Sequence, residues 1–156
     1  MKFGIFTSIN CRGRGMRALS TRLLQGRRSR QVELADQLGI DYAWEVEHHF
    51  LEEYSHSSAP EIFLAACSQR TKNIRLGHGI CLMPPKYNHP ARVAERIATL
   101  DLVSNGRVEF GTGESRLLME LGGLQCRPRR SREAADVARG RRAMRQHAGD
   151  GPLSRL

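Results

Sequence analysis

Strand-like and helix-like segments alternate along the chain, and this alternation constrains its fold more than any other feature of the sequence. Segments with helical spacing of apolar residues begin near Gln31, Pro60 and Pro90. Short apolar runs typical of buried strands lie around them, at residues 3–6, 42–46, 74–82 and 108–111. The alternation predicts parallel strands joined by right-handed helical crossovers, in part of a (β/α)8 barrel or in a doubly wound sheet.

The length of the chain bears on the first of these folds. With 156 residues it is short for a closed (β/α)8 barrel, which typically needs about 250. The sequence contains no run of about 18 apolar residues, so we expect no membrane span and a cytoplasmic protein. The four cysteines lack C-x-x-C spacing, and we expect them to be reduced thiols.

The formal net charge of +9 is concentrated in two Arg-rich segments. Residues 7–30 carry seven Arg and no acidic residue, and residues 125–156 carry nine Arg against three acidic residues. These segments contribute +7 and +6, which leaves −4 for the rest of the chain. Excess positive charge is typical of nucleic-acid-binding proteins, but such arms usually mix Lys with Arg, and every basic residue here is Arg. Nucleic-acid binding is therefore kept as the alternative function.

Three clusters of polar residues follow or end the predicted strands, where parallel α/β proteins place catalytic groups. Glu47-His48-His49 follows the second strand, His78 lies within the third, and residues 111–115 follow the fourth. Neighbouring residues at a strand end point to opposite faces. We therefore expect only one of His48 and His49 to face a common site.

The third cluster has two glycines and an acid. Gly111 and Gly113 let the backbone approach a ligand, and Glu114 is a candidate acid or base, or a solvated residue at a helix start. A third glycine of a dinucleotide-binding fingerprint is lacking, so a Rossmann fold is poorly supported. A metal-dependent hydrolase that uses Glu47-His48-His49 is a further alternative, but no second ligand cluster with metal spacing accompanies it, and we assign no metal site.

An ordered set of short motifs runs through residues 31–115. These motifs are Asp41-Tyr42-Ala43-Trp44 before Glu47-His48-His49-Phe50, then His89-Pro90, Ala94-Glu95-Arg96, Leu100-Asp101, Ser104-Asn105-Gly106-Arg107 and Phe110-Gly111-Thr112-Gly113. Together they resemble the bacterial-luciferase-like family of flavin-dependent monooxygenases. The resemblance implies an α/β fold that is the N-terminal half of a (β/α)8 TIM barrel, with about four parallel strands.

The resemblance also implies an activity. It predicts an oxidoreductase that oxygenates a small organic substrate with O2 and reduced FMN, which a flavin reductase supplies, and a deazaflavin is the alternative cofactor. The candidate catalytic residues are His48, which matches the family's acid–base histidine, and its neighbour His49. Bacterial luciferase has a reactive Cys and a phosphate-binding Arg where this chain has Gly113 and Glu114, so we do not expect a long-chain aldehyde substrate. The expected cofactor contacts are His78, Gly79, Ile80, Gly111, Gly113 and Glu114.

The two ends of the chain do not share this resemblance. Residues 7–30 and 124–156 are rich in Arg, Gly, Ala and Ser, a composition that GC-rich codons give when they are read out of frame. We therefore expect a partial barrel over residues 1–123, with an atypical, frameshifted stretch at 7–30, and a frameshifted or disordered tail over 124–156. We expect this chain to be inactive by itself, and a homo- or hetero-oligomer is compatible with the sequence.

Overall fold

Four parallel strands form one sheet in the order β1-β2-β3-β4. They are β1 (Gly4–Thr7), β2 (Tyr42–Glu45), β3 (Arg75–Leu82) and β4 (Val108–Gly113). This computed structural model describes residues 1–8, 23–51, 55–115 and 117–126, and only the backbone of residues 23–25. Each strand pairs with the next one along the chain, so the predicted parallel arrangement with helical crossovers is confirmed.

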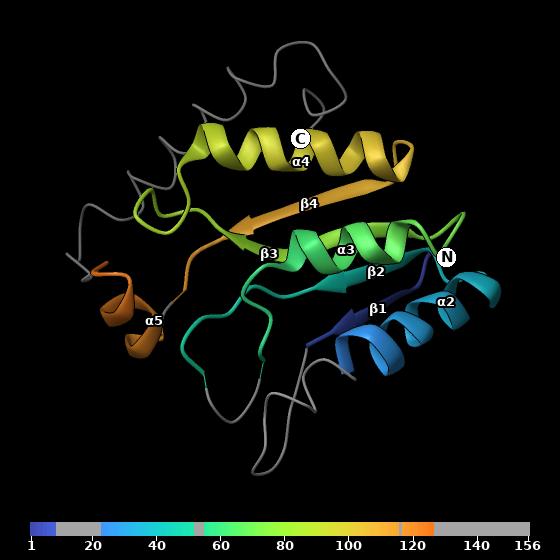
Figure 1. Cartoon of the computed structure of the whole chain (residues 1–156), viewed down its shortest axis with the longest axis horizontal. Helices are drawn as coiled ribbons and strands as arrows, with labels where there is room; N and C mark the ends of the chain where they lie inside the picture. The colour runs from blue at the N-terminus through green and yellow to red at the C-terminus, as the bar shows by residue number, and fades with distance from the viewer. Residues whose placement is uncertain (9–22, 52–54, 116, 127–156) are drawn as a thin grey trace.

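Three helices pack against one face of the sheet, namely α2 (Ser29–Gln37), α3 (Pro60–Ser68) and α4 (Pro90–Ser104) (Figure 1). α3 and α4 each have a proline in the first turn, where the missing N–H costs no helical hydrogen bond. α4 ends at Ser104 and is followed by Asn105 and Gly106, whose φ angles of 59° and 74° lie in the left-handed region. The predicted starts of α3 and α4 are therefore confirmed.

The chain before α2 and after α3 differs from the prediction. A π-helical segment, η1 (Leu23–Arg28), leads directly into α2, so helical structure begins before Gln31. From the sequence, Lys72-Asn73 predicts the end of the helix that starts at Pro60, whereas α3 ends earlier, at Ser68. The reason lies in Asp36, whose carboxylate accepts the backbone N–H groups of residues 72–74 at 2.6–2.8 Å. These amides bind a side chain of another helix, which turns the chain into β3.

The core lies between the sheet and the three helices. Each helix contributes residues at helical spacing, among them Val32 from α2, Leu64 from α3 and Ile97 from α4. The opposite face of the sheet carries Trp44, whose ring lies against Gly77 of β3. A Cβ atom at Gly77 would lie 2.4 Å from the Trp44 ring, so only glycine fits this position.

The sheet is followed by a short helix, which the sequence did not predict. β4 continues to Gly113, beyond the predicted end at Gly111, and α5 (Leu118–Gly123) follows. All four strand arrows point toward the end of the sheet near which α5 lies (Figure 1). α5 therefore stands where groups from the ends of several strands can meet.

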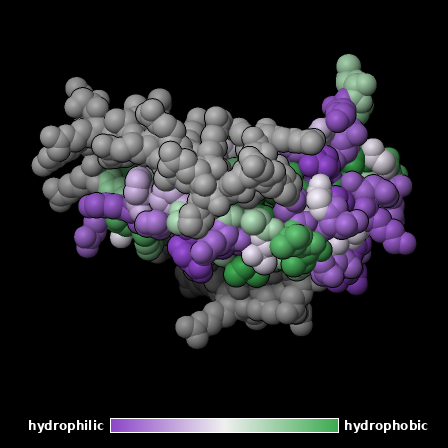
Figure 2. Space-filling view, turned by 90° about the horizontal axis from the view of Figure 1, so that it is seen from above, coloured by the Kyte–Doolittle hydropathy of each residue, from purple (hydrophilic) through white to green (hydrophobic). Residues whose placement is uncertain are grey.

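The described surface mixes hydrophobic and hydrophilic residues (Figure 2). Within the described ranges, none of the helices has the length and apolar character needed to cross a membrane. Cys67 and Cys81 are buried free thiols, as predicted, Cys126 is buried as well, and Cys11 lies outside the described residues. Most of both Arg-rich segments also lies outside them, and so do the nucleic-acid and frameshift interpretations attached to these segments.

Candidate functional site

The Glu47-His48-His49 cluster follows β2, and its two histidines diverge. His48 Nδ1 lies 2.9 Å from Oε1 of Glu120 in α5, whereas His49 Nε2 lies 3.0 Å from Oε1 of Glu47. The backbone N–H of His48 donates to the Ser57 carbonyl at 2.8 Å, and this hydrogen bond fixes the backbone at His48. The prediction that adjacent histidines face different surroundings is therefore confirmed.

His48 faces a hollow of about 260 Å³ at the carboxyl ends of the strands, which we call the strand-end hollow. It is lined by Val46, Glu47, His48, Gly79, Ile80, Leu82, Glu114, Ser115 and Leu117. Four of the predicted site residues thus come together here, from β2, β3 and the segment between β4 and α5. Most of the other walls are apolar, which suits the planar ring of a flavin.

Glu120 fixes the orientation of His48. Its carboxylate is fully buried and also accepts the backbone N–H of His49 at 2.9 Å and the hydroxyl of Ser115. A carboxylate only accepts hydrogen bonds, so Nδ1 of His48 carries the hydrogen in this pair. The side chain of His48 is 26% exposed, and it lines the strand-end hollow while Glu120 holds its ring from behind.

The third strand bulges beside His48. The register between β3 and β4 shifts between His78 and Cys81, so Gly79 and Ile80 leave the ladder with β4, and both line the strand-end hollow. Bulges of this kind re-aim backbone and side chains next to binding sites. The bulge therefore supports the expected contact of Gly79 and Ile80 with a ligand.

The two glycines of β4 lie beside the strand-end hollow, not in its lining. A Cβ atom at Gly111 would lie 2.4 Å from the carbonyl oxygen of His78, and one at Gly113 would lie 2.0 Å from the Ile80 side chain. Both glycines thus allow β4 to approach β3 closely. Glu114, the next residue, is exposed and lines the hollow.

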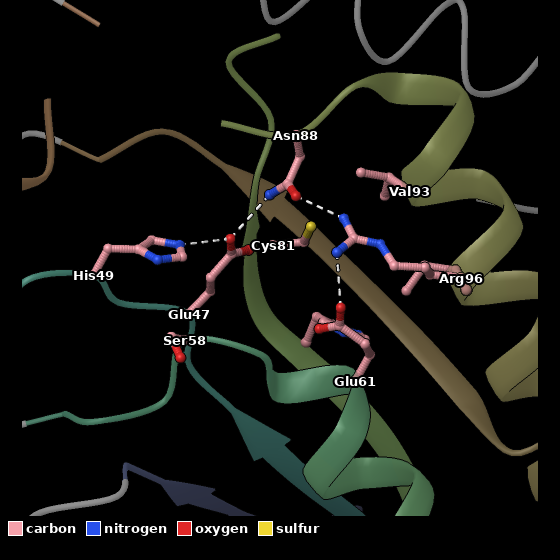
Figure 3. Close-up of a pocket in the computed structure, with 10 residues that line it drawn as sticks. Glu47, His49, Ser58, Glu61, Cys81, Asn88, Val93 and Arg96 are labelled. Atoms are coloured by element: carbon pink, nitrogen blue, oxygen red, sulfur yellow. Dashed lines mark hydrogen bonds and ion pairs between the residues drawn. The ribbon is translucent and has the colours of Figure 1, made fainter. Parts of the chain in front are cut away.

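His49 faces a second hollow of about 180 Å³ on the helix side of the sheet, which we call the helix-side hollow. A chain of hydrogen bonds crosses it (Figure 3). Glu47 Oε1 accepts from His49 and from Asn88 Nδ2 at 2.9 Å, and Arg96 donates to Asn88 Oδ1 at 2.6 Å and to Glu61 Oε1 at 2.8 Å. The five side chains come from the end of β2, the segment before α4, α4 and α3.

Burial and hydrogen bonding act against each other at Glu47. Burial raises the pKa of this carboxyl. The hydrogen bonds from His49, the Leu82 amide and Asn88 lower the pKa by more than burial raises it, so the net shift is downward. The hydrogen bond to Glu47 raises the pKa of His49. The pair therefore favours a charged carboxylate next to a protonated imidazole.

His78 does not join the other predicted cofactor contacts. Its ring packs edge-on against Phe110 at 5.7 Å and lines the helix-side hollow, whereas Gly79 and Ile80 line the strand-end hollow. Strand alternation turns Gly79 away from His78, and the bulge between His78 and Cys81 brings Ile80 to the same side as Gly79. Burial lowers the pKa of His78 to about 4, so its imidazole is neutral at neutral pH.

Sequence reasoning missed Glu120, Asn88 and Arg96 as parts of these sites. Only Arg96 had been noticed, as one letter of a motif, and an acid in the first turn of a short helix is the one signal for Glu120. The rings of His48 and His49 bind different glutamates, so they do not converge as shared metal ligands would. The geometry instead provides a histidine, His48, that is held by the buried carboxylate of Glu120.

A family model described as "Luciferase-like monooxygenase" matches residues 1–152. The 4-hydroxyprotoasukamycin monooxygenase of Streptomyces nodosus subsp. asukaensis is 36% identical over 134 residues, which cover 81% of this chain and 34% of that protein. The F420-dependent glucose-6-phosphate dehydrogenase of Amycolatopsis mediterranei (strain U-32) is 36% identical over 90 residues, 56% of this chain and 26% of that protein. The chain spans between about a quarter and a third of these relatives.

Solved structures show the same arrangement. The crystal structure of monooxygenase RslO1 from Streptomyces bottropensis has a TM-score of 0.79 at 32% identity, over 94% of this chain and 42% of that one. The oxygenating constituent of 3,6-diketocamphane monooxygenase from Pseudomonas putida, in complex with FMN, has a TM-score of 0.80 at 22% identity, over 94% and 39%. These likenesses confirm the predicted fold class, four parallel strands that match part of a TIM barrel. The proteins similar to this chain include users of FMN and of F420.

Proposed function

The chain belongs to the luciferase-like monooxygenase family, and we propose that in a closed barrel it supplies the acid–base half of a flavin-dependent monooxygenase. The proposed enzyme oxygenates a small organic substrate with O2 and reduced FMN, which a separate flavin reductase delivers. The observation that carries the proposal is the pair of His48 and the fully buried Glu120 at the strand-end hollow. A histidine held by a carboxylate at the carboxyl ends of barrel strands suits general acid–base catalysis.

His48 has the central role in this proposal. Glu120 holds its ring at Nδ1, and we propose that the imidazole takes up or releases a proton at a molecule in the strand-end hollow. Ser115 and the backbone of His49 hold Glu120 in turn, which keeps the imidazole in one orientation. We propose His48 as the acid–base residue, Glu120 as its positioning residue and His49 as a neighbour with a structural role.

The residues of the strand-end hollow fit the ring of a flavin better than they fit the whole cofactor. Val46, Ile80 and Leu82 give an apolar wall beside the Gly79–Ile80 bulge, and FMN bound there would supply the electrons that activate O2. The volume of about 260 Å³ lies below the range of about 300–1,000 Å³ typical of ligand pockets. No Lys or Arg is part of the described lining, so a phosphate must be held elsewhere.

A second candidate is an F420-dependent dehydrogenase of the same family, because one relative similar to this chain carries that activity. The two candidates differ in what the bound cofactor does, since a dehydrogenase transfers hydride and needs no O2. We favour the monooxygenase because the relative with the larger matched region and the similar crystal structure with 32% identity are both monooxygenases.

The experiment that tests the proposal uses a purified protein that carries this chain in a closed barrel. It is titrated with oxidised FMN, reduced FMN and F420, and binding is followed by ring fluorescence and turnover by oxygen consumption. FMN binding that His48→Ala leaves intact, with oxygen consumption that His48→Ala and Glu120→Gln lower, would support it. Preferential binding of F420 without oxygen consumption would favour the dehydrogenase. If neither cofactor binds a protein that carries a closed barrel, the proposal is wrong.

The 156-residue chain by itself is expected to give no coupled oxygenation. Its described residues form four strands, with β1 and β4 at the two edges of an open sheet, and His48 at the strand-end hollow is partly exposed. Water that reaches an oxygen-activating cofactor diverts the reaction, because such chemistry requires a shielded site. Coupled turnover by the isolated chain would contradict this expectation.

Several expectations from the sequence stay predictions. These are the division at residue 123, the frameshifts in residues 7–30 and 124–156, a cytoplasmic location and a role of His78 in cofactor binding. Sequencing the coding DNA tests the frameshifts, because a single inserted or deleted base on each side of a segment would restore a family-like reading.

A further inference from the structure

Phe50, the last residue of the Glu47-His48-His49-Phe50 motif, lines neither the strand-end hollow nor the helix-side hollow. Its side chain is 53% exposed, and its φ angle of 59° lies in the left-handed region. Bulky residues rarely adopt this conformation, and residues held in it cluster at functional sites. The contacts of the ring show what this conformation achieves.

The ring of Phe50 lies against Gly123 of α5. A Cβ atom at Gly123 would lie 2.4 Å from the ring, whereas one at the adjacent Gly122 would meet no other described part of the chain within 4 Å. The centroid of the Phe50 ring also lies 6.2 Å from that of the His49 ring. Gly123 therefore lets the segment after β2 pack closely on α5, without a side chain in between.

Gly123 and Glu120 lie on the same side of α5, because residues three positions apart in a helix are neighbours. Glu120 contacts the same segment after β2, through the side chain of His48 and the backbone N–H of His49. A helix of six residues is not stable by itself in water, so its position depends on its packing. The contact between Phe50 and Gly123 therefore stabilises the side of α5 that presents Glu120 to His48.

On the basis of the acid–base role proposed for His48, we propose that Phe50 is a further positioning residue for this histidine. The ring of Phe50 packs on Gly123 and so holds α5 where Glu120 reaches Nδ1 of His48. The segment after β2 thus carries the acid–base histidine and, two residues later, the ring that secures the carboxylate partner of this histidine. Phe50 acts through α5 and not through the substrate or the cofactor.

The two glycines of α5 offer a matched pair of variants, tested by turnover in a protein that carries this chain in a closed barrel. Gly123→Ala and Gly122→Ala gain the same methyl group in the same helix, but only the first meets the Phe50 ring. A misplaced catalytic group can lower the rate by up to about 10²-fold. We expect Gly123→Ala to lower kcat by about 10-fold and to leave the KM for reduced flavin within about twofold. Gly122→Ala should keep the turnover of the unmodified protein.

Phe50→Ala tests the contact from its other side, and we expect it to lower kcat as Gly123→Ala does. When the ring is absent, the methyl group at position 123 no longer meets it. The double variant should therefore have the turnover of Phe50→Ala alone, because changes to two residues in contact are not additive. If the two losses multiply instead, the residues act independently and the proposal is wrong.

His48→Ala separates this proposal from the function on which it rests. Normal turnover of His48→Ala would overturn the acid–base role of His48, and the positioning role of Phe50 with it. If His48→Ala lowers turnover while Gly123→Ala matches Gly122→Ala, only the role of Phe50 is overturned.

Nuclear magnetic resonance on the same proteins gives a measurement that does not depend on activity. We expect a nuclear Overhauser effect between the Phe50 ring and the Hα protons of Gly123. We also expect a hydrogen-bonded Nδ1–H signal of His48 that Gly122→Ala keeps and Gly123→Ala loses. A Gly123→Ala protein that keeps this signal, or an unmodified protein that lacks the Overhauser effect, would overturn the proposal.

Discussion

The strand-end hollow and the helix-side hollow share Glu47 as a wall, yet they are built in different ways. In the helix-side hollow, the charged groups pair with one another across the space, from His49 through Glu47, Asn88 and Arg96 to Glu61 (Figure 3). In the strand-end hollow, the walls are mostly apolar, and His48 is anchored through one nitrogen to a carboxylate behind it.

The contrast shows how neighbouring residues of the same type acquire different roles. A histidine whose proton is held in a network with its partner stabilises the fold, as His49 does with Glu47. A histidine that a buried carboxylate holds at the edge of a hollow, as Glu120 holds His48, is suited to move protons. Four predictions test this contrast, from the largest expected effect to the smallest.

The largest effect is expected for His48→Ala, measured as steady-state turnover in a protein that carries this chain in a closed barrel. Removal of a general acid or base lowers turnover by about 10²–10⁴-fold, while flavin affinity changes little. His49→Ala is the matched control and should change turnover far less. Equal losses of flavin affinity and turnover in His48→Ala would assign His48 to flavin binding. An equal loss of turnover in His48→Ala and His49→Ala would show that the two histidines do not differ in role.

The next effect concerns the shared wall. Glu47→Ala removes the acceptor for His49, Asn88 and the Leu82 amide at once. Breaking a buried, hydrogen-bonded pair of this kind costs about 3–5 kcal/mol of unfolding free energy, measured by urea denaturation. Glu95→Ala, at a surface ion pair with 50% exposure, should cost less than about 1 kcal/mol. Similar losses in the two variants would show that the helix-side network contributes little to stability.

The third prediction is a pH dependence that comes from His78. Burial lowers the folded-state pKa of His78 from 6.5 to about 4. Between these two pH values, the imidazole is therefore protonated in the unfolded chain but neutral in the folded chain. Stability therefore falls as the pH drops from about 6.5 to about 4, by roughly 3 kcal/mol from this one group.

The check is to compare unfolding free energies at pH 7 and pH 4.5 for the unmodified protein and for His78→Leu. The variant should lose less stability on acidification, although the carboxyls with lowered pKa values contribute equally to both proteins. An identical loss would mean that His78 binds a proton as readily in the folded state as in the unfolded state.

The smallest effect is expected for His49→Gln. Its hydrogen bond raises the pKa of His49, so the stabilisation from the pair is fully present below the unfolded pKa of about 6.5. This stabilisation is lost as the pH rises through the folded-state pKa. The variant should be less stable than the unmodified protein by about 1 kcal/mol at pH 6, and by less at pH 9. A difference that grows with pH would contradict the protonated pair.

Much of the fold could be predicted because its signals are local. Pro60 and Pro90 mark helix starts, and Asn105-Gly106 marks a helix end, through conformational preferences that act within one turn. The end of α3 was wrong because its determinant, Asp36, lies 36–38 residues from the amides it binds. α5 was missed because a six-residue helix gives almost no periodic signal.

The sequence by itself determined the order of strands and helices, the family, and the placement of Glu47-His48-His49 at a strand end, since periodicity, caps and motifs are properties of short segments. Only the tertiary structure decided which histidine faces which hollow. Glu120 binds His48 across 72 residues, and Asn88 binds Glu47 across 41. The pleat and the bulge of β3 together turn Gly79 and Ile80 away from His78. These pairings depend on which chain segments the sheet brings together, and no local sequence pattern encodes contacts between residues that lie so far apart in the chain.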